Sequence, residues 1–277
     1  MKVSIIIPAR NEVYLANTIM DLLTKAHGDI EIIPILDGYL PAIPTDPRVK
    51  PIYKEKAEGM RPAINDAAQK ATGEFLMKCD AHCSFAEGYD EVLKADCDKD
   101  WVVTLKRFGL DPENWKIIED PREAHYLSYP FHNPNKPPIL RGLTWKARAS
   151  ERKHILIDDE MSSQGSCWFM YKSYFEKFNG LQLDGYGPFV QEFQEIGNRT
   201  WLSGGRVIIN KKTWYGHWYK RSGQGYVLSP RQSKEGLAYS FDFWYNNRWP
   251  KRIHDLSWLV DLFWPVPEWP AAGDRHV

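Results

Sequence analysis

Strand-like and helical patterns alternate through the first 108 residues, and this alternation limits the possible folds more than any other feature. Apolar runs rich in β-branched residues, typical of strands, lie at 3–8, 30–36, 49–54, 74–80 and 101–108. Helical patterns lie between them at 11–26, 61–71 and 88–97. The order predicts an α/β fold with a mostly parallel, Rossmann-like sheet flanked by helices. Pro34 lacks an N–H, so we expect the second run at an edge or irregular position.

The ends of these strands carry the first candidate site residues. Open α/β sheets bind ligands beyond the carboxyl ends of their strands. Pro8, Asp37 and Asp80 all fall at such ends. This edge of the sheet is therefore where we expect the functional site.

The rest of the chain is less regular. Residues 109–165 are rich in Pro, His and charge and have weak periodicity, which indicates an insertion. Helical patterns return at 171–178 and 189–201, the second ending at Gly204-Gly205, and a strand follows at 206–210. The C-terminal stretch carries five tryptophans, and we expect these to pack on the core rather than form a binding platform. They are Trp244, Trp249, Trp258, Trp264 and Trp269.

Composition excludes several classes of protein. The 277 residues are 43% hydrophobic and have zero net charge, which argues against a disordered chain and a general polyanion binder. The four cysteines form no CxxC pair and predict free thiols in a reducing compartment. No run of 18 apolar residues occurs, so we expect no membrane span and a cytoplasmic location.

A basic stretch at 141–153 surrounds Trp145. It has two interpretations: a solvated loop, or a contact with an acidic acceptor such as nucleic acid through phosphates and stacking. Its cations are Arg141, Lys146, Arg148, Arg152 and Lys153.

Asp80 and His82 lie two residues apart at a strand end, so their side chains can face one object. A carboxylate oxygen with an imidazole nitrogen suits Mn²⁺, whereas Mg²⁺ prefers oxygen ligands alone. Two protein ligands are few for such a metal, and phosphate oxygens commonly complete the shell. The pair predicts a diphosphate ligand, or else an ordinary solvated loop. Asp37 could accept from a base N–H, or could be a turn residue before Gly38.

Three ordered blocks resemble a known family. They are VSIIIPARNE (3–12), EGMRPAINDAAQKATGEFLMKCDAHC (58–83) and YFEKFNGLQLDGYGPFVQEFQEIGNRTWLSGG (174–205), followed by WYGHWYKR (214–221). Together they resemble the GT-A nucleotide-sugar glycosyltransferases, and most closely the catalytic domain of the polypeptide N-acetylgalactosaminyltransferases. The resemblance covers residues 1–105 and 165–222.

The resemblance implies a UDP-sugar donor and a role for each matching residue. Asp80, His82 and His217 would hold Mn²⁺ (or Mg²⁺) against the two phosphates. Glu192 would face the sugar and the acceptor, and Arg61 would approach the phosphate or the sugar; both are candidate catalytic residues. The remaining donor-binding candidates are Pro8, Ala9, Arg10 and Glu12 around the nucleotide, Asp37 at the uracil, Gly59, Asp80 itself, and Arg221 at the diphosphate.

The same resemblance suggests a division of the chain. Residues 1–222 would form the GT-A domain, with a nucleotide-sugar-binding half (1–108), an acceptor-side insertion (109–165) and an acceptor and metal half (166–222). Residues 223–277 would be an extension packed on it. The predicted function is metal-dependent transfer of a sugar from a UDP-sugar to a hydroxyl acceptor of unidentified kind: glycan, protein or modified nucleic acid.

One departure from the family pattern and two rival classes of protein leave alternatives open. Many inverting relatives carry Glu-Asp where this chain has Glu192-Phe193, so the sequence does not decide between inversion and retention. A binder of nucleotide sugars without catalysis is one alternative. A sugar nucleotidyltransferase is the other, although PARNE stands where a glycine-rich phosphate loop would be expected.

Overall fold

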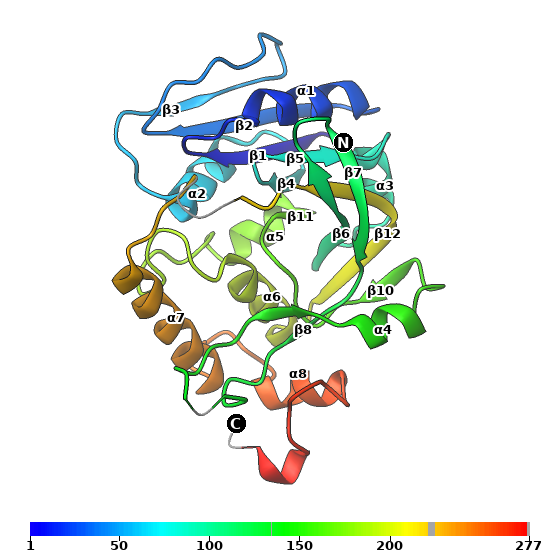
Figure 1. The fold of residues 1–277 in the computed structure, drawn as a ribbon, viewed down its shortest axis with the longest axis vertical. Coiled ribbons are helices and arrows are strands. Elements are labelled where there is room, and N and C mark those ends of the chain that lie inside the picture. Colours follow the sequence, from blue (N-terminus) through cyan, green and yellow to red (C-terminus); the bar gives the residue numbers. More distant parts are fainter. Residues whose placement is uncertain (134, 221–224, 276–277) are drawn as a thin grey trace.

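A mixed β-sheet forms the centre of the computed structural model, which describes residues 1–133, 135–220 and 225–275 (Figure 1). Its strands are β1 (Val3–Ala9), β2 (Ile30–Asp37), β3 (Ile52–Lys54), β4 (Phe75–Cys79), β5 (Cys83–Phe85), β6 (Trp101–Asp111), β7 (Lys116–Arg122), β10 (Ile157–Asp159), β11 (Cys167–Tyr171) and β12 (Arg206–His217). They follow the order β10-β12-β6-β11-β4-β1-β2-β3, with β5 paired to β12 and β7 to β6. A separate ribbon joins β8 (His125–Leu127) to β9 (Gly142–Thr144).

Strands from the first 80 residues form the parallel part of the sheet, β3-β2-β1-β4, which confirms the predicted alternation. Of the two positions expected for Pro34, the edge is wrong, because β2 lies between two neighbours, and the irregular one is confirmed. The Ile32 N–H donates to Arg48 toward β3, and N–H groups two residues apart face the same side. The missing N–H of Pro34 therefore faces β3, where pairing is interrupted between Val49 and Ile52.

An antiparallel strand, β11, separates the two parallel parts of the sheet by pairing with both β4 and β6. The sequence analysis did not predict this strand. Its residues, CWFMY, are almost wholly buried on both faces, so they show no alternation of polar and apolar side chains. Because β11 runs against β4, it brings residues 164–166 to the carboxyl end of β4, where Asp80 lies.

Helices cover both faces of the sheet. α1 (Leu15–Lys25) and α3 (Tyr89–Ala95) pack on one face, and α2 (Met60–Lys70), α5 (Lys172–Lys177) and α6 (Glu192–Leu202) pack on the other. Side chains of β1 alternate accordingly, because Ile5 and Ile7 join the core with α1 whereas Ile6 joins the core with α2. In β4, Lys78 shares the face of Leu76, toward α6.

The segment at 109–165 is more regular than its sequence suggested. β7 forms a hairpin with β6, and β10 joins the main sheet beside β12. α4 (Lys146–Glu151) lies between them in the chain. β10 was hidden because a three-residue strand gives too few side chains for a pattern, and β7 was hidden because it is mostly exposed and lacks an apolar face.

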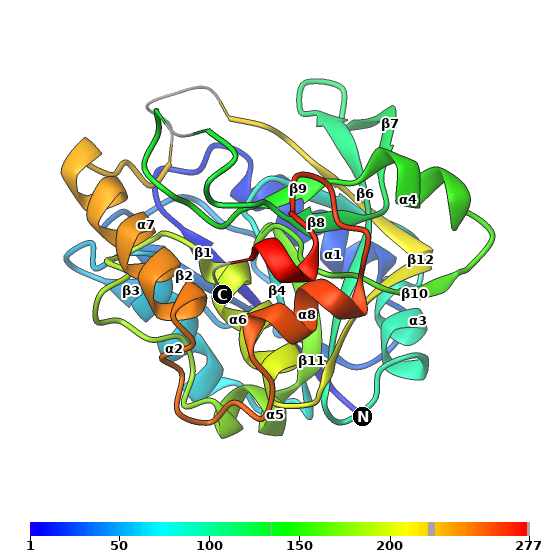
Figure 2. The same cartoon turned by 90° about the horizontal axis from the view of Figure 1, so that it is seen from below.

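The C-terminal stretch adds α7 (Pro230–Tyr245), α8 (Leu256–Leu262) and a short 3₁₀ turn (Ala272–Asp274). Figure 2, seen from below, shows α7 and α8 in front of the sheet. Trp244, Trp249 and Trp269 are buried in the core cluster that contains α6, and Trp258 packs against it. Trp264 is 44% exposed. Four of the five tryptophans thus pack as expected.

Candidate active site

Three predicted metal ligands converge at the carboxyl edge of the sheet. Asp80 follows β4, His82 precedes β5, and His217 ends β12 opposite Cys83 of β5. One ligand atom from each lies within 4.8 Å of the others. Asp80 Oδ2 lies 3.2 Å from His217 Nε2 and 3.7 Å from His82 Nε2. The pairing of β12 with β5 therefore brings together Asp80 and His217, which are 137 positions apart in the chain.

Glu12 orients one of these ligands. Its Oε2 lies 3.2 Å from His82 Nδ1, and its Oε1 accepts from Lys220 at 2.5 Å. A carboxylate on one ring nitrogen directs the other nitrogen toward a metal and raises its basicity. Glu12, expected in the nucleotide pocket, thus contacts the candidate metal site through His82.

The protonation states suit a divalent cation. Burial, opposed by Asp80, lowers the pKa of His217 to about 4, so its imidazole is neutral at pH 7 as a ligand must be. Burial alone would raise the pKa of Asp80, but Lys78 and the two histidines hold it well below the usual range. One carboxylate oxygen and two imidazoles form a donor set that fits Mn²⁺.

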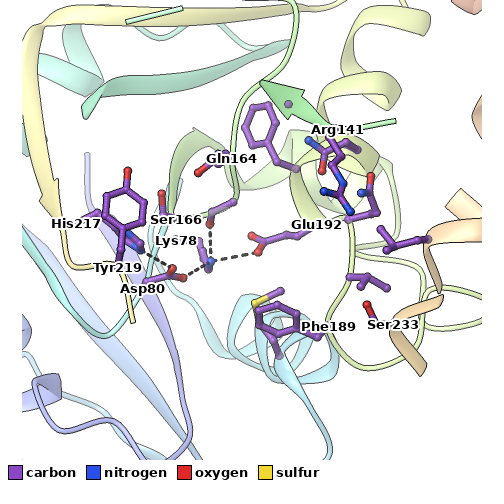
Figure 3. Close-up of a pocket in the computed structure, with 18 residues that line it drawn as sticks. Lys78, Asp80, Arg141, Gln164, Ser166, Phe189, Glu192, His217, Tyr219 and Ser233 are labelled. Carbon is purple, nitrogen blue, oxygen red and sulfur yellow. Dashed lines mark hydrogen bonds and ion pairs between the residues drawn. The ribbon is translucent and has the colours of Figure 1, made fainter. Parts of the chain in front are cut away.

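Lys78, which sequence reasoning missed, connects this site to Glu192. Its buried ammonium donates to Asp80 Oδ1 at 2.7 Å, to the Gly165 carbonyl at 2.5 Å and to Glu192 Oε2 at 3.1 Å (Figure 3). Burial would lower the pKa of Lys78, but the two carboxylates outweigh it and raise that pKa. The signal in the sequence was a lysine within an otherwise apolar strand, where a charge must be paired.

Glu192 begins α6, so its carboxylate lies at the positive end of the helix dipole. Its Oε1 accepts from Trp168 Nε1 at 2.6 Å, while Oε2 faces Lys78. Burial nevertheless raises the pKa of Glu192. A Cβ at position 165 would lie 2.7 Å from Glu192 Oε2, so any larger residue there would have to displace this carboxylate.

A cavity of about 460 Å³ opens between the candidate metal ligands and Glu192. Asp80, His217 and Lys78 line one part of it, as Figure 3 shows, and Glu192 lines another. The remaining lining residues named in Figure 3 are Arg141, Gln164, Ser166, Phe189, Tyr219 and Ser233. A cavity of this size, with carboxylate, ammonium and amide groups, can hold a sugar beside a metal-bound phosphate.

Arg61 is not among the residues that line this cavity in the described part of the chain. It is fully buried, pairs with Glu195, and donates to the carbonyls of Gln182 at 2.8 Å and Val190 at 3.1 Å. Its guanidinium also lies 4.1 Å from the Tyr186 ring centre. These contacts fix the segment that leads into α6, and through it the position of Glu192.

The Asp37 side chain is hydrogen-bonded to the backbone at Gly59. The Asp37 carboxylate is fully buried and accepts from the backbone N–H groups of Glu58, at 2.8 Å, and Gly59, at 2.9 Å. Gly59 has a φ of +113°, and a Cβ there would lie 2.3 Å from Pro188. The predicted uracil contact of Asp37 stays a prediction, beside this observed role at the start of α2.

The remaining donor-binding candidates lie after β1. Pro8 and Ala9 are buried at its end, and Arg10 follows, half-buried. Arg221 lies outside the described residues. Their contacts with a nucleotide stay predictions.

The basic stretch at 141–153 is partly neutralised. Arg152 forms a two-pronged ion pair with Asp158, and Arg148 lies 3.8 Å from the same carboxylate. Trp145 is buried, which leaves it unavailable for base stacking. Arg141 alone of these cations lines the cavity.

Comparison with known proteins places the chain in a family. Residues 4–178 match the model of glycosyl transferase family 2. The chain belongs to glycosyl transferase family 2. A probable N-acetylgalactosaminyltransferase 6 from Caenorhabditis elegans is 25% identical over 248 residues, which cover 79% of this family 2 chain and 38% of the relative. The chain thus spans about two-fifths of the length of that relative.

Solved structures establish the fold of this family 2 chain as GT-A. GalNAc-T7 with UDP, GalNAc and Mn²⁺ superposes with a TM-score of 0.69 at 18% identity, over 89% of this chain and 49% of that one. TarS 1–349 from S. aureus in complex with UDP-GlcNAc gives 0.54 at 15%, over 87% and 67%. The mannosyltransferase PcManGT from Pyrobaculum calidifontis, with GDP-Man and Mn²⁺, gives 0.52 at 14%, over 80% and 58%.

Within the described part of the chain, no helix combines the length and the apolar character that crossing a bilayer requires.

Proposed function

We propose that this chain is a metal-dependent glycosyltransferase that moves a sugar from a UDP-sugar to a hydroxyl acceptor. The observation that carries the proposal is the convergence of Asp80, His82 and His217 next to a cavity that also contains Glu192. Nucleotide sugars or their parts accompany Mn²⁺ in two of the similar structures, with UDP and GalNAc in one and GDP-Man in the other. A UDP donor agrees with the resemblance in the sequence.

Asp80, His82 and His217 would hold Mn²⁺, or Mg²⁺, against the donor diphosphate. When bound, the ion neutralises charge that develops on the departing diphosphate and keeps the donor in place. Glu12 holds the His82 ring in place, and Lys78 binds Asp80 Oδ1, which leaves Oδ2 beside the two histidines, where it could bind the cation. The chain's own contribution is a set of ligands fixed before the donor arrives.

Glu192 would bind the sugar or the acceptor hydroxyl rather than attack. Both of its oxygens already accept from buried donors, Trp168 and Lys78, which hold the carboxylate in a fixed position and oppose the movement that an attack on the sugar would need. This arrangement supports retention of configuration by attack on the face from which the diphosphate leaves. Arg61 would position Glu192 through Val190 and Glu195, with direct phosphate contact as the alternative.

The acceptor is a hydroxyl compound that enters the cavity beside Arg141. A nucleic-acid acceptor bound along 141–153 would have to use the cations that Asp158 leaves unpaired. The paired arginines and the buried Trp145 favour an acceptor that enters the cavity itself.

Thermal unfolding with Mn²⁺ and UDP tests the proposal. Ligand at 100 times its Kd stabilises the native state by about 2.7 kcal/mol, so the melting temperature should rise when both are present. Asp80→Ala should abolish the rise. Asp29→Ala, which removes a side chain 66% exposed before β2, is the matched control and should keep it.

Turnover distinguishes a transferase from a protein that only binds nucleotide sugars. Mn²⁺-dependent release of UDP from a UDP-sugar, lost in Asp80→Ala, is expected of the transferase. Tight binding of UDP with no release from UDP-GalNAc, UDP-GlcNAc or UDP-glucose, with or without sugar and peptide acceptors, would instead favour the non-catalytic binder.

A further inference from the structure

A chain of buried polar side chains runs from the sheet to the cavity wall. It starts at Thr104 and Glu160, passes through His125 and Arg107, and ends at Gln164. Thr104 Oγ1 lies 2.5 Å from Glu160 Oε2, and Glu160 Oε1 lies 2.6 Å from His125 Nδ1. Arg107 Nη2 lies 3.0 Å from His125 Nε2, and Arg107 Nη1 lies 2.8 Å from Gln164 Oε1.

Arg107 fixes the direction of the hydrogen bonds on either side of it. A guanidinium only donates, so the His125 nitrogen that faces it must be the unprotonated Nε2. The ring proton then lies on Nδ1 and is donated to Glu160. On the other side, the Gln164 atom that faces Arg107 must be the amide oxygen, which settles the orientation of that amide.

The Gln164 NH₂ group is thereby left facing the cavity. Gln164 is half-buried and lines the cavity, and among the residues that the structure describes none accepts a hydrogen bond from its amide nitrogen. Arg107, His125 and Glu160 are each at least 97% buried, so rotation of the amide would place its NH₂ against the Arg107 donor in a dry environment. The protein therefore presents a donor of fixed direction to whatever occupies the cavity.

The position of Gln164 relates it to the sugar. The neighbouring Ser166 carbonyl accepts from the Asp80 N–H at 2.9 Å, and the Gly165 carbonyl accepts from Lys78. Gly165 and Ser166 therefore lie directly beside the candidate metal ligand, and Gln164 lies next to them on the wall of the same cavity, as Figure 3 shows for Gln164 and Ser166. A sugar attached to a diphosphate at Asp80 is the first group that extends from there into the cavity.

We infer that Gln164 is a donor-sugar specificity residue, whose amide donates a hydrogen bond to a hydroxyl or carbonyl oxygen of the sugar and whose orientation is fixed by Arg107, His125 and Glu160. This inference rests on the proposed function. The recognised group must be an acceptor oxygen, and a sugar that lacks it would bind with the amide unsatisfied. Arg107, His125 and Glu160 are positioning residues in this scheme.

The competing explanation is that Gln164 only satisfies Arg107. Gln164→Glu separates the two, because a carboxylate keeps the shape and accepts from Arg107 but cannot donate to a sugar. Gln164→Met removes both functions at the same length. It also guards against a charge effect, because the carboxylate introduced by Gln164→Glu would lie near Glu192 and Asp80. Unliganded melting temperatures show whether each variant folds.

The experiment measures Kd by calorimetry, with Mn²⁺, for UDP, UDP-GalNAc, UDP-GlcNAc and UDP-glucose. For the UDP-sugar that the wild type binds more tightly than UDP, both variants should lose about 3- to 10-fold in the ratio Kd(UDP)/Kd(UDP-sugar), the value of one neutral hydrogen bond. Their affinity for UDP itself should stay within about twofold of the wild type.

Three results would overturn the inference. One is an unchanged ratio in both variants. Another is an equal loss of affinity for UDP and UDP-sugar, which indicates damage to the metal or diphosphate site. The third is a wild type that binds no UDP-sugar more tightly than UDP. If the wild type does not bind UDP with Mn²⁺ at all, the proposed function itself fails and the inference fails with it.

Discussion

At the scale of single residues, Lys78 explains why two acidic groups can share a buried site. Asp80 and Glu192 each lie within 3.1 Å of its ammonium, so the lysine separates their charges and fixes both carboxylates. Removing one partner of such a buried set costs several kcal/mol because it leaves an uncompensated charge. The geometry ties the candidate metal site and the sugar side of the cavity into one unit.

Glu192→Gln tests the role of this unit in the reaction. An amide keeps the shape and can still accept from Trp168 or Lys78, so we expect a loss of about 10- to 100-fold in UDP-sugar turnover, the scale of one lost charged hydrogen bond. The sugar released by hydrolysis should keep its anomeric configuration, as followed by NMR. Glu176→Gln, which changes an exposed carboxylate on α5, is the matched control.

A different outcome would assign Glu192 another role. A loss of about 10⁴-fold or more together with an inverted product would mean that Glu192 acts as the general base, and the contacts with Trp168 and Lys78 would then tune its basicity instead of restraining it.

At the scale of elements, Arg61 links α2 to the start of α6. Its guanidinium reaches the Gln182 and Val190 carbonyls and Glu195 at once, a geometry that a lysine cannot reproduce. We expect Arg61→Lys to lower the free energy of unfolding by about 1 to 3 kcal/mol, because an ammonium can still pair with Glu195 but leaves a carbonyl of Gln182 or Val190 without its donor. Chemical denaturation measures it. Arg61→Met with Glu195→Gln removes both charges of this pair but leaves the buried Arg199 without the carboxylate that it also contacts, so we expect this double variant to be no more stable than Arg61→Lys.

The same variants separate positioning from direct phosphate contact. If Arg61 only positions α6, the folded Arg61→Met/Glu195→Gln protein should bind UDP and Mn²⁺ within a few-fold of the wild type. A loss of about 100-fold or more in UDP affinity, in a variant that folds, would show that Arg61 reaches the diphosphate.

Long apolar strands and amphipathic helices were predictable from the sequence. The strand and the site residues that were missed have physical reasons for it. The parallel strands β1, β2 and β4 are apolar runs and the helices between them have a clear amphipathic period, and Asp80 and His82 were found because they follow such a strand. β11 was missed because CWFMY has no β-branched residue and runs directly into α5, so its end was assigned to that helix. Lys78 and Gln164 were missed because their partners, Glu192 and Arg107, lie 114 and 57 positions away in the chain.

At the scale of the whole molecule, the two edges of the sheet hold different groups of polar residues. The carboxyl edge holds the candidate metal ligands, while the amino edge holds a buried network around Glu31. Glu31 Oε1 accepts from Ser4 and from the Thr72 N–H at 2.6 Å each, and Oε2 accepts from Lys50 at 2.6 Å. The network ties β1, β2 and the turn before β4 together without touching the cavity.

Glu31 should therefore make global stability depend on pH. Burial would raise its pKa, but Lys50, Ser4 and Thr72 outweigh it and lower the pKa to about 2, from 4.5 in an unfolded chain. Because the unfolded chain takes up the proton first, the stabilisation is complete above pH 4.5 and disappears as the pH falls to about 2. For a side chain only 1% exposed, the difference amounts to about 3 kcal/mol.

The measurement is denaturant unfolding of the wild type and Glu31→Gln between about pH 6 and pH 2. Other carboxylates also titrate in this window, so the informative quantity is the difference in unfolding free energy between the two proteins. That difference should shrink as the pH falls from 4.5, because the protonated glutamate and the glutamine become alike. A difference that stays constant down to about pH 2 would mean that the Glu31 network does not stabilise the charged form, and that the amino edge holds together through packing alone. Binding of UDP and Mn²⁺ at pH 7 should be the same in both proteins, since the two edges act independently.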